Sequence, residues 1–149
     1  PFGGVVVAGY RWRSDFASHA EISRLLEVPV RSVELVDERF YHLDLAFCPL
    51  DQRRALIAPL AFDRYGLAVL TSLVPEPIWL EDDEALSFSA NSVVVDDTVV
   101  MPACSGRLGR LLESLGFTVA LSPVADFLKA GGGCRCLTLA LDVRLSGAN

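Results

Sequence analysis

A cysteine, a histidine and an aspartate supply residue types from which a nucleophilic site can be built. Cys136 closes a glycine-rich run, Gly131-Gly-Gly-Cys-Arg-Cys. Glycine lets a backbone approach a small ligand more closely than a residue with a Cβ atom allows. His42 and Asp44 stand two residues apart in an apolar run, and on a strand they would point to the same face. Together these residues predict a Cys/His nucleophilic site with a carboxylate that can hold a cationic substrate.

Each of these residues also has a structural interpretation. Cys136 could be a buried strand cysteine that behaves as a small hydrophobic residue. Arg135 favours the chemical interpretation, because a basic neighbour can lower the pKa of a thiol. Cys134 is a second candidate nucleophile, but it lies closer to the flexible glycines, and we favour Cys136. His42 and Asp44 could instead form a self-contained pair that faces solvent.

The composition is that of a folded protein without a membrane segment. The 149 residues can form one domain, residues 1–149, and the hydrophobic content of 52% excludes a disordered chain. No apolar run approaches the roughly 20 residues that cross a bilayer, and no signal-peptide pattern is present. We therefore expect a soluble, cytoplasmic protein.

Charge and cysteine usage narrow the possible partners. A net charge of −6 argues against nucleic acid, which is bound by clustered Lys and Arg, and is compatible with a cationic small molecule. Four cysteines stand at positions 48, 104, 134 and 136 without a CxxC pair. They predict reduced thiols rather than disulfides, and no metal site.

Hydrophobic periodicity and turn residues predict alternating strands and helices. The strands are expected at residues 4–10, 30–36, 40–47, 55–58, 78–80, 92–95, 98–101, 117–121 and 136–143. The helices are expected at residues 14–27, 59–73, 107–115 and 124–129, with a short helix or turn at 81–87. The order strand, strand, helix, strand occurs twice, which predicts an α/β protein with short mixed sheets.

Within the first of these helices, the apolar side chains are expected to face the core. They are Phe16, Ile22, Leu25 and Leu26.

Several of these segments resemble one known family in the order in which they occur. The run from Gly131 to Cys136, together with Tyr41-His42-Leu-Asp44, is similar to the guanidine-modifying superfamily of arginine deiminases, dimethylargininases and amidinotransferases. Gly9-Tyr-Arg-Trp-Arg-Ser resembles its Gly-x-x-x-Arg-Thr segment. Glu84-Ala followed by Asn91-Ser-Val resembles its Glu-Ala…Asn-x-Val segment, so that the resemblance covers nearly all of the chain.

The resemblance implies an α/β-propeller of ββαβ units around a pseudo-fivefold axis, with the active site at its centre. This chain would then be a partial propeller containing the C-terminal three units. By position in the motifs, Cys136 corresponds to the nucleophile and His42 to the general acid/base. Asp44 corresponds to a carboxylate that grips the guanidinium group, and Arg13 to an arginine that binds the substrate carboxylate. No cofactor is implied.

The function implied is hydrolysis of an arginine-type or methylated-arginine guanidine through a covalent thiouronium intermediate. The chain departs from the family where it reads Phe2-Gly-Gly-Val, without the acidic residues expected there. A partner chain or self-association is therefore expected to complete the propeller. The alternatives are a catalytically impaired fragment that acts as a binding or assembly module, an amidinotransferase, and an unrelated α/β domain with a structural cysteine.

Three further segments have ordinary structural interpretations. Arg13 and Arg11 can be solvated charges at a helix start. Asn91 is interpreted as a turn or strand-edge residue. Residues 82–84, all acidic, are interpreted as a solvated helix N-terminus, where negative charge is favoured.

Overall fold

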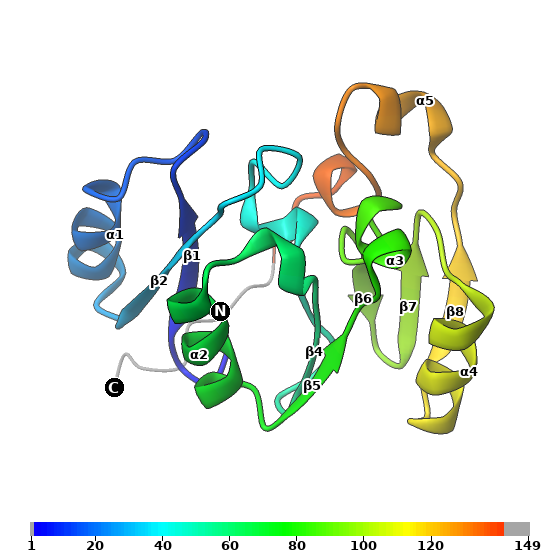
Figure 1. Cartoon of the computed structure of the whole chain (residues 1–149). Coiled ribbons are helices and arrows are strands. Elements are labelled where there is room, and N and C mark those ends of the chain that lie inside the picture. Colours follow the sequence, from blue (N-terminus) through cyan, green and yellow to red (C-terminus); the bar gives the residue numbers. More distant parts are fainter. Residues whose placement is uncertain (1, 142–149) are drawn as a thin grey trace.

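The computed structural model describes residues 2–141 and shows a mixed α/β fold with three small sheets (Figure 1). The strands are β1 (Val6–Tyr10), β2 (Val30–Glu34), β3 (Phe47–Pro49), β4 (Arg54–Ile57), β5 (Glu76–Trp79), β6 (Val93–Val95), β7 (Thr98–Met101) and β8 (Thr118–Leu121). The α-helices are α1 (Ser18–Leu26), α2 (Arg64–Leu73), α3 (Asp82–Leu86), α4 (Gly106–Ser114) and α5 (Ala125–Lys129). The 3₁₀ helices are η1 (Leu43–Leu45), η2 (Pro59–Ala61) and η3 (Arg135–Leu137).

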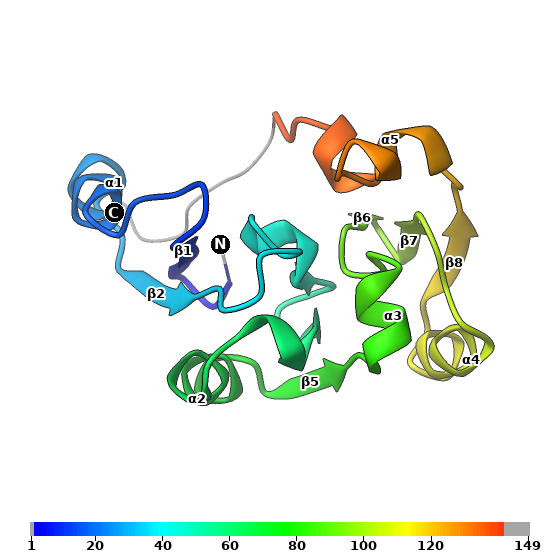
Figure 2. The ribbon, with the colours of Figure 1, turned by 45° about the horizontal axis from the view of Figure 1, so that its top comes forward.

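Two of the three sheets have the same construction. In the sheet β3-β4-β5, β3 pairs antiparallel with β4, and β5 pairs parallel with β4 after the crossover helix α2. In the sheet β6-β7-β8, the same order recurs with α4 as the crossover helix. The third sheet holds the parallel pair β1 and β2, joined by α1. Figure 2 shows α1, α2 and α4 at the periphery of the molecule. The strand–strand–helix–strand repeat expected from the sequence is thus confirmed.

Local turn chemistry explains where the second repeat changes direction. Asp96 has a φ of 54°, in the left-handed region that short hairpin turns require, and it joins β6 to β7. Gly116 follows the end of α4 with a φ of 90°, as expected of a glycine just after a helix. Both breaks lie where the sequence predicts them.

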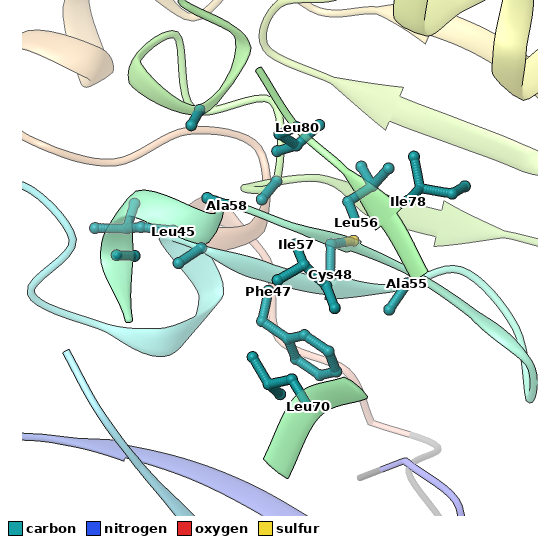
Figure 3. Packing of buried hydrophobic residues seen from close by; sticks show 14 of the residues in the cluster. Leu45, Phe47, Cys48, Ala55, Leu56, Ile57, Ala58, Leu70, Ile78 and Leu80 are labelled. Atoms are coloured by element: carbon teal, nitrogen blue, oxygen red, sulfur yellow. The ribbon is translucent and has the colours of Figure 1, made fainter. Parts of the chain in front are cut away.

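One buried cluster connects the sheets and helices. It contains the central strand β4, where Ala55, Leu56 and Ile57 are fully buried, and Leu70 of α2. Figure 3 shows these side chains together with others from β3 and β5. Burial of a side chain as large as that of Leu70 stabilises the fold by about 1.5–3 kcal/mol. The core therefore holds β3 and the turn that precedes it in a defined position.

The strand expected at residues 40–47 is wrong. Residues 43–45 form η1, in which the Leu45 amide bonds the His42 carbonyl at 3.2 Å, and the strand β3 begins only at Phe47. The apolar alternation misleads because Leu43 and Leu45 both pack against the core although they lie in a 3₁₀ turn. His42 and Asp44 consequently do not share the face of a strand.

The strand expected at residues 136–143 is also wrong over its described part. Arg135 to Leu137 form η3, and residues 138–141 are not in a strand. Residues 142–143 lie outside the described part of the chain. The bond from the Thr138 amide to the Arg135 carbonyl closes a local turn instead of a sheet ladder.

The expected inner face of α1 is wrong for Phe16, Leu25 and Leu26, whereas Ile22 is half-buried. Phe16, just before the helix, is 59% exposed and Leu25 is 79% exposed, whereas the buried residue of the helix is His19. The His19 ring hydrogen-bonds Ser32 on β2 at 2.7 Å, which satisfies its polar atom at the helix–sheet contact.

Within residues 2–141, no helix has the length and apolar character needed to cross a bilayer.

Candidate active site

Cys136 lies at the centre of η3, directly after the glycine-rich loop. All four cysteines are free, and Cys136 is the exposed one among them. Burial raises the pKa of Cys48 to about 12, and burial also raises the pKa of Cys134 and of Cys104. A thiol must be both reachable and able to ionise in order to attack a substrate. Exposure therefore favours Cys136 as the reactive thiol.

The Cys136 thiol contacts a carboxylate and an amide. Its Sγ atom lies 3.3 Å from Oδ2 of Asp44, to which the thiol donates, and 3.2 Å from Nδ2 of Asn91, which donates to the sulfur. Burial raises the pKa of Cys136, and the negative charge of Asp44 raises it further, against the donors Asn91 and Gly133. In the absence of a bound cation, the site thus favours the neutral thiol.

Asp44 reaches the thiol because it is the middle residue of η1. The turn follows the extended residue His42 and is closed by the bond from the Ala46 amide to the Leu43 carbonyl at 2.9 Å. Leu45 and Ala46 are fully buried and attach the turn to the core. The turn therefore directs the half-buried Asp44 toward the loop that carries the cysteine.

His42 lies at the start of the same turn and is exposed. Its ring packs against Tyr41 with centroids 5.2 Å apart. Among the described residues, no hydrogen bond to the His42 ring is present. The structure therefore brings Cys136 and Asp44 into direct contact but does not bring His42 into hydrogen-bond contact with either residue.

Arg13 is linked to the glycine-rich loop through Tyr41. The Arg13 guanidinium lies 4.4 Å from the centroid of the Tyr41 ring, and the Tyr41 hydroxyl donates to the Gly131 carbonyl at 2.5 Å. A Cβ atom on Gly131 would come within 2.4 Å of that hydroxyl, at a φ of 96°. Tyr41 thus connects Arg13, which packs on its ring, to the glycine-rich loop that leads to Cys136.

Asn91 is the site residue that the sequence interpretation missed. Its side chain is completely buried and bonds Asp44, Cys136 and Gly133. It does occupy a bend before β6, so the turn interpretation describes its backbone but not its side chain. The available signal was its place in the Glu-Ala…Asn-x-Val resemblance, with Glu84 seven positions earlier.

A cavity of about 410 Å³ adjoins the carboxylate. Asp44 and Arg135 line it, together with apolar residues of β1, β3 and β6, whereas Cys136 and His42 do not. Asp44 therefore contacts the thiol and also lines the cavity. Within residues 2–141, no three His, Cys, Asp or Glu side chains are grouped so that they could hold a metal ion.

An α/β fold that places an exposed thiol beside a carboxylate has the groups expected of an enzyme with a cysteine nucleophile.

Comparison with known proteins identifies the family. The chain is 43% identical over 134 residues to the bifunctional arginine dihydrolase/ornithine cyclodeaminase ArgZ of Synechocystis sp., covering 89% of this chain and 19% of that protein. It is 38% identical over 137 residues to N(G),N(G)-dimethylarginine dimethylaminohydrolase of Mycobacterium tuberculosis, covering 92% of this chain and 45% of that protein.

A solved structure supports the same relationship. The N-terminal domain of ArgZ, in a variant covalently bound to a reaction intermediate, superposes with a TM-score of 0.87 at 43% identity. The match covers 89% of this chain and 50% of that one. No profile of a known protein family matches the chain. The chain belongs to the guanidine-modifying superfamily, and it spans less than half the length of the two relatives named.

Proposed function

We propose that this chain carries the nucleophile of an enzyme that hydrolyses an arginine-type or methylated-arginine guanidine. The observation that carries the proposal is the contact between the exposed thiol of Cys136 and the carboxylate of Asp44. A thiol beside a carboxylate can attack a cation that the carboxylate holds. The names of the relatives, an arginine dihydrolase and a dimethylarginine dimethylaminohydrolase, support this class of substrate.

The first half of the reaction forms a bond to sulfur. Asp44 holds the planar guanidinium by charge-assisted hydrogen bonds, next to the cavity that it lines. The positive charge of the substrate offsets the negative charge of Asp44, which removes a cause of the raised pKa of Cys136. The Cys136 thiol releases its proton to solvent, and the resulting thiolate adds to the guanidinium carbon. His42 protonates the departing nitrogen, and the C–N bond breaks to leave a covalent thiouronium.

The second half returns the thiol. His42, now neutral, takes a proton from water, and the resulting hydroxide attacks the thiouronium carbon. The C–S bond breaks and yields a ureido product and Cys136. For His42 to serve both steps, its exposed ring must turn toward Cys136 when substrate is present, since apo geometry is often looser than that of the bound state. The covalently bound intermediate in the ArgZ domain supports a covalent route.

Arg13 is proposed to bind the carboxylate of an amino-acid substrate. Its guanidinium is exposed and rests on the Tyr41 ring, beside the hydroxyl that holds the glycine-rich loop. A planar guanidinium suits bidentate binding of a carboxylate. An arginine-like molecule would then lie with its carboxylate at Arg13 and its guanidinium at Cys136.

We also propose that the chain is the C-terminal three-unit part of an α/β-propeller. The recurring strand–strand–helix–strand order supports the repeat. Among residues 2–141, Asp44 is the one carboxylate that lines the cavity, and one carboxylate holds a guanidinium less firmly than two would. A further part of the propeller, from a longer chain or a partner, would add the missing contacts. Four free cysteines support a cytoplasmic location.

Two measurements test the proposed hydrolysis. Arginine and N(G),N(G)-dimethylarginine are incubated with the protein and with its Cys136→Ala variant, and the ureido product is quantified. We expect product only with the unsubstituted chain. Equal product from both proteins would remove Cys136 from the mechanism.

The second measurement does not require turnover. The alkylation rate of Cys136 by cationic 2-chloroacetamidine is compared with that by neutral 2-chloroacetamide. We expect the cationic reagent to react faster, and we expect this preference to disappear in Asp44→Asn. An absent preference in the unsubstituted protein would contradict a preformed cation site.

A further inference from the structure

The buried side chain of Asn91 connects three segments that are distant in the sequence. On one side, its Nδ2 atom donates to Oδ2 of Asp44 at 3.0 Å and to Sγ of Cys136 at 3.2 Å. On the other side, its Oδ1 atom accepts from the Gly133 amide at 2.8 Å and from the Cys136 amide at 3.3 Å. An amide side chain offers two N–H donors and one carbonyl acceptor, so all of its polar capacity is spent on this site.

The backbone of Asn91 adds to these contacts. The Arg135 amide donates to the Asn91 carbonyl at 3.1 Å, which ties η3 to the bend before β6. On the opposite side of the bend, the Asn91 amide donates to the Phe88 carbonyl at 2.8 Å. The backbone of Asn91 is thus hydrogen-bonded through both its amide and its carbonyl.

The glycine-rich loop is shaped to receive this side chain. An added Cβ atom on Gly133 would lie 2.9 Å from Oδ1 of Asn91 and 3.1 Å from Cγ of Pro102. The close approach that glycine permits therefore serves the Asn91 amide. The buried amide makes five hydrogen bonds, one of them to the Asp44 carbonyl at 3.2 Å. Loss of any partner would leave a buried polar group unsatisfied and cost free energy, so the arrangement is held firmly.

We propose that Asn91 is a positioning residue that orients Cys136 and Asp44 and supplies a hydrogen bond that favours the thiolate. It acts through these two residues and does not itself contact the substrate. The inference rests on the proposed function for the identity of the attacking atom. The thiol is surrounded by Asp44 as the charged group that acts on it, by the Gly133 amide, and by Arg135 as its neighbour in sequence.

The hydrogen bond from Asn91 to Cys136 differs in strength between the neutral thiol and the thiolate. The neutral thiol donates to Asp44 and gains little from the amide. The thiolate is an acceptor only, and the Nδ2 donor then becomes a hydrogen bond to a charged atom, which is the stronger kind. Removal of this donor should therefore slow the reactions of the thiolate more than it disturbs the fold.

The test uses two variants that remove the donor, Asn91→Asp and Asn91→Leu. Only Asn91→Asp adds a negative charge beside the thiol, so the lost hydrogen bond is judged by a displacement that both variants show. Alkylation of Cys136 by neutral iodoacetamide is followed across pH by peptide mass spectrometry. Trypsin cleaves after Arg135 and so separates Cys134 from Cys136. We expect a roughly tenfold lower rate near neutral pH and a profile displaced to higher pH, because a hydrogen bond to a charged group is lost. With arginine as substrate, kcat should fall more than KM changes.

Ser89→Ala is the matched control. Ser89 is also fully buried and lies in the turn just before Asn91, and its hydroxyl bonds the Ala103 carbonyl at 3.0 Å. Its loss should lower stability without moving the alkylation profile. A profile in either Asn91 variant that matches that of the unsubstituted protein would overturn the proposal. If the unsubstituted protein has no hydrolase activity but the Asn91 variants still show a displaced profile, the role of Asn91 is supported and the proposed function is contradicted.

If either Asn91 variant does not fold, hydrogen exchange on the unsubstituted protein decides the question. The Gly133 amide lies in a loop and the Cys136 amide lies in the short 3₁₀ helix η3. Both amides donate to the Asn91 side chain. We expect them to be protected as strongly as the amides of β4. Rapid exchange of both would show that Asn91 does not hold the loop.

Discussion

The sulfur of Cys136 lies 3.3 Å from a carboxylate oxygen of Asp44, so the candidate nucleophile and the candidate cation-binding group form one hydrogen-bonded pair. The negative charge of Asp44 opposes ionisation of the thiol and contributes to the raised pKa of Cys136, after burial. The same charge attracts a guanidinium. Binding and activation are therefore coupled, because a cation that satisfies Asp44 also removes the repulsion that keeps the thiol neutral.

Replacement of Asp44 by Asn should make Cys136 more reactive toward neutral reagents. An acid whose pKa is raised by a neighbouring charge becomes easier to ionise when that charge is removed. We expect the pH profile of iodoacetamide alkylation to move to lower pH, while hydrolysis of arginine is lost. Asp97→Asn is the matched control, since it removes the same charge from the exposed hairpin turn. A profile that stays in place in Asp44→Asn would contradict the coupling.

Replacement of His42 by Ala should separate catalysis from thiol reactivity. His42 is exposed and makes no hydrogen bond to Cys136 within the described residues, so alkylation of the thiol should keep its rate. Loss of a general acid/base lowers kcat by roughly 100- to 10,000-fold. Steady-state kinetics and the alkylation rate measure the two effects. If kcat were unchanged, His42 would have no part in the reaction.

The covalent intermediate gives a second reading of the same variant. If His42 activates the water of the second step, His42→Ala should accumulate the thiouronium on Cys136. Intact-protein mass spectrometry after mixing with arginine would detect the added mass. A variant that is slow in the first step alone would show no adduct, and His42 would then act mainly as the acid.

Local signals were sufficient to predict much of the fold. Asp96-Asp97 between two β-branched runs predicts the hairpin β6–β7, and Gly116 predicts the end of α4, because both depend on the conformation of one or two residues. The apolar run around Leu43 and Leu45 failed for the converse reason. Alternation cannot distinguish a strand from a 3₁₀ turn when both leucines reach the core.

The residues missed at the site depend on contacts between distant segments. Asn91 reads as a turn residue between Ala90 and Ser92, and its burial follows only when the loops at Asp44 and Cys136 close over it. Those partners are separated from it by 47 and 45 positions. Sequence identified Cys136 as chemically unusual but could not show which side chains would surround it.

Glu84 is a second case in which a local interpretation failed. An acidic run at a helix start is typical of a solvated N-terminus, yet Glu84 is 2% exposed. It completes a capping box with Glu81 and also bonds Ser105 and Arg107, which come more than twenty positions later. The partner that makes burial possible lies in another part of the sequence.

Replacement of Gly133 by Ala should disturb the site through a clash. The new Cβ atom would lie 2.9 Å from Oδ1 of Asn91, whose side chain is buried and cannot move away. We expect a loss of about 1–3 kcal/mol in the free energy of unfolding, since overpacking carries that cost. Gly109→Ala within α4 is the matched control. There the nearest atom, Sγ of Cys104, would be at an ordinary 3.7 Å, and alanine should stabilise the helix by about 1 kcal/mol.

Denaturant unfolding of the two alanine variants measures both changes. The same substitution should thus act with opposite sign at the two glycines. Equal changes would show that the loop at Gly133 adapts and that its close approach to Asn91 is not required. The alkylation rate of Cys136 should also change in Gly133→Ala and stay constant in Gly109→Ala.

Replacement of Glu84 by Gln should weaken the fold at neutral pH and have less effect in acid. Burial alone would raise the pKa of Glu84, but hydrogen bonds from Arg107, Ser105 and the Glu81 amide outweigh it and lower the pKa below the ordinary 4.5. A lowered folded pKa contributes stability above the unfolded pKa, and that contribution is lost as the pH falls through the folded pKa.

We expect Glu84→Gln to cost about 1–3 kcal/mol near neutral pH, because bonds to a buried charge are lost. The difference from the unsubstituted protein should shrink with acidification, as measured by urea unfolding at successive pH values. Glu76→Gln, which removes an exposed ion pair with Arg53, should cost less than about 1 kcal/mol. A difference at Glu84 that is constant with pH would mean that the carboxylate is not ionised in the folded protein.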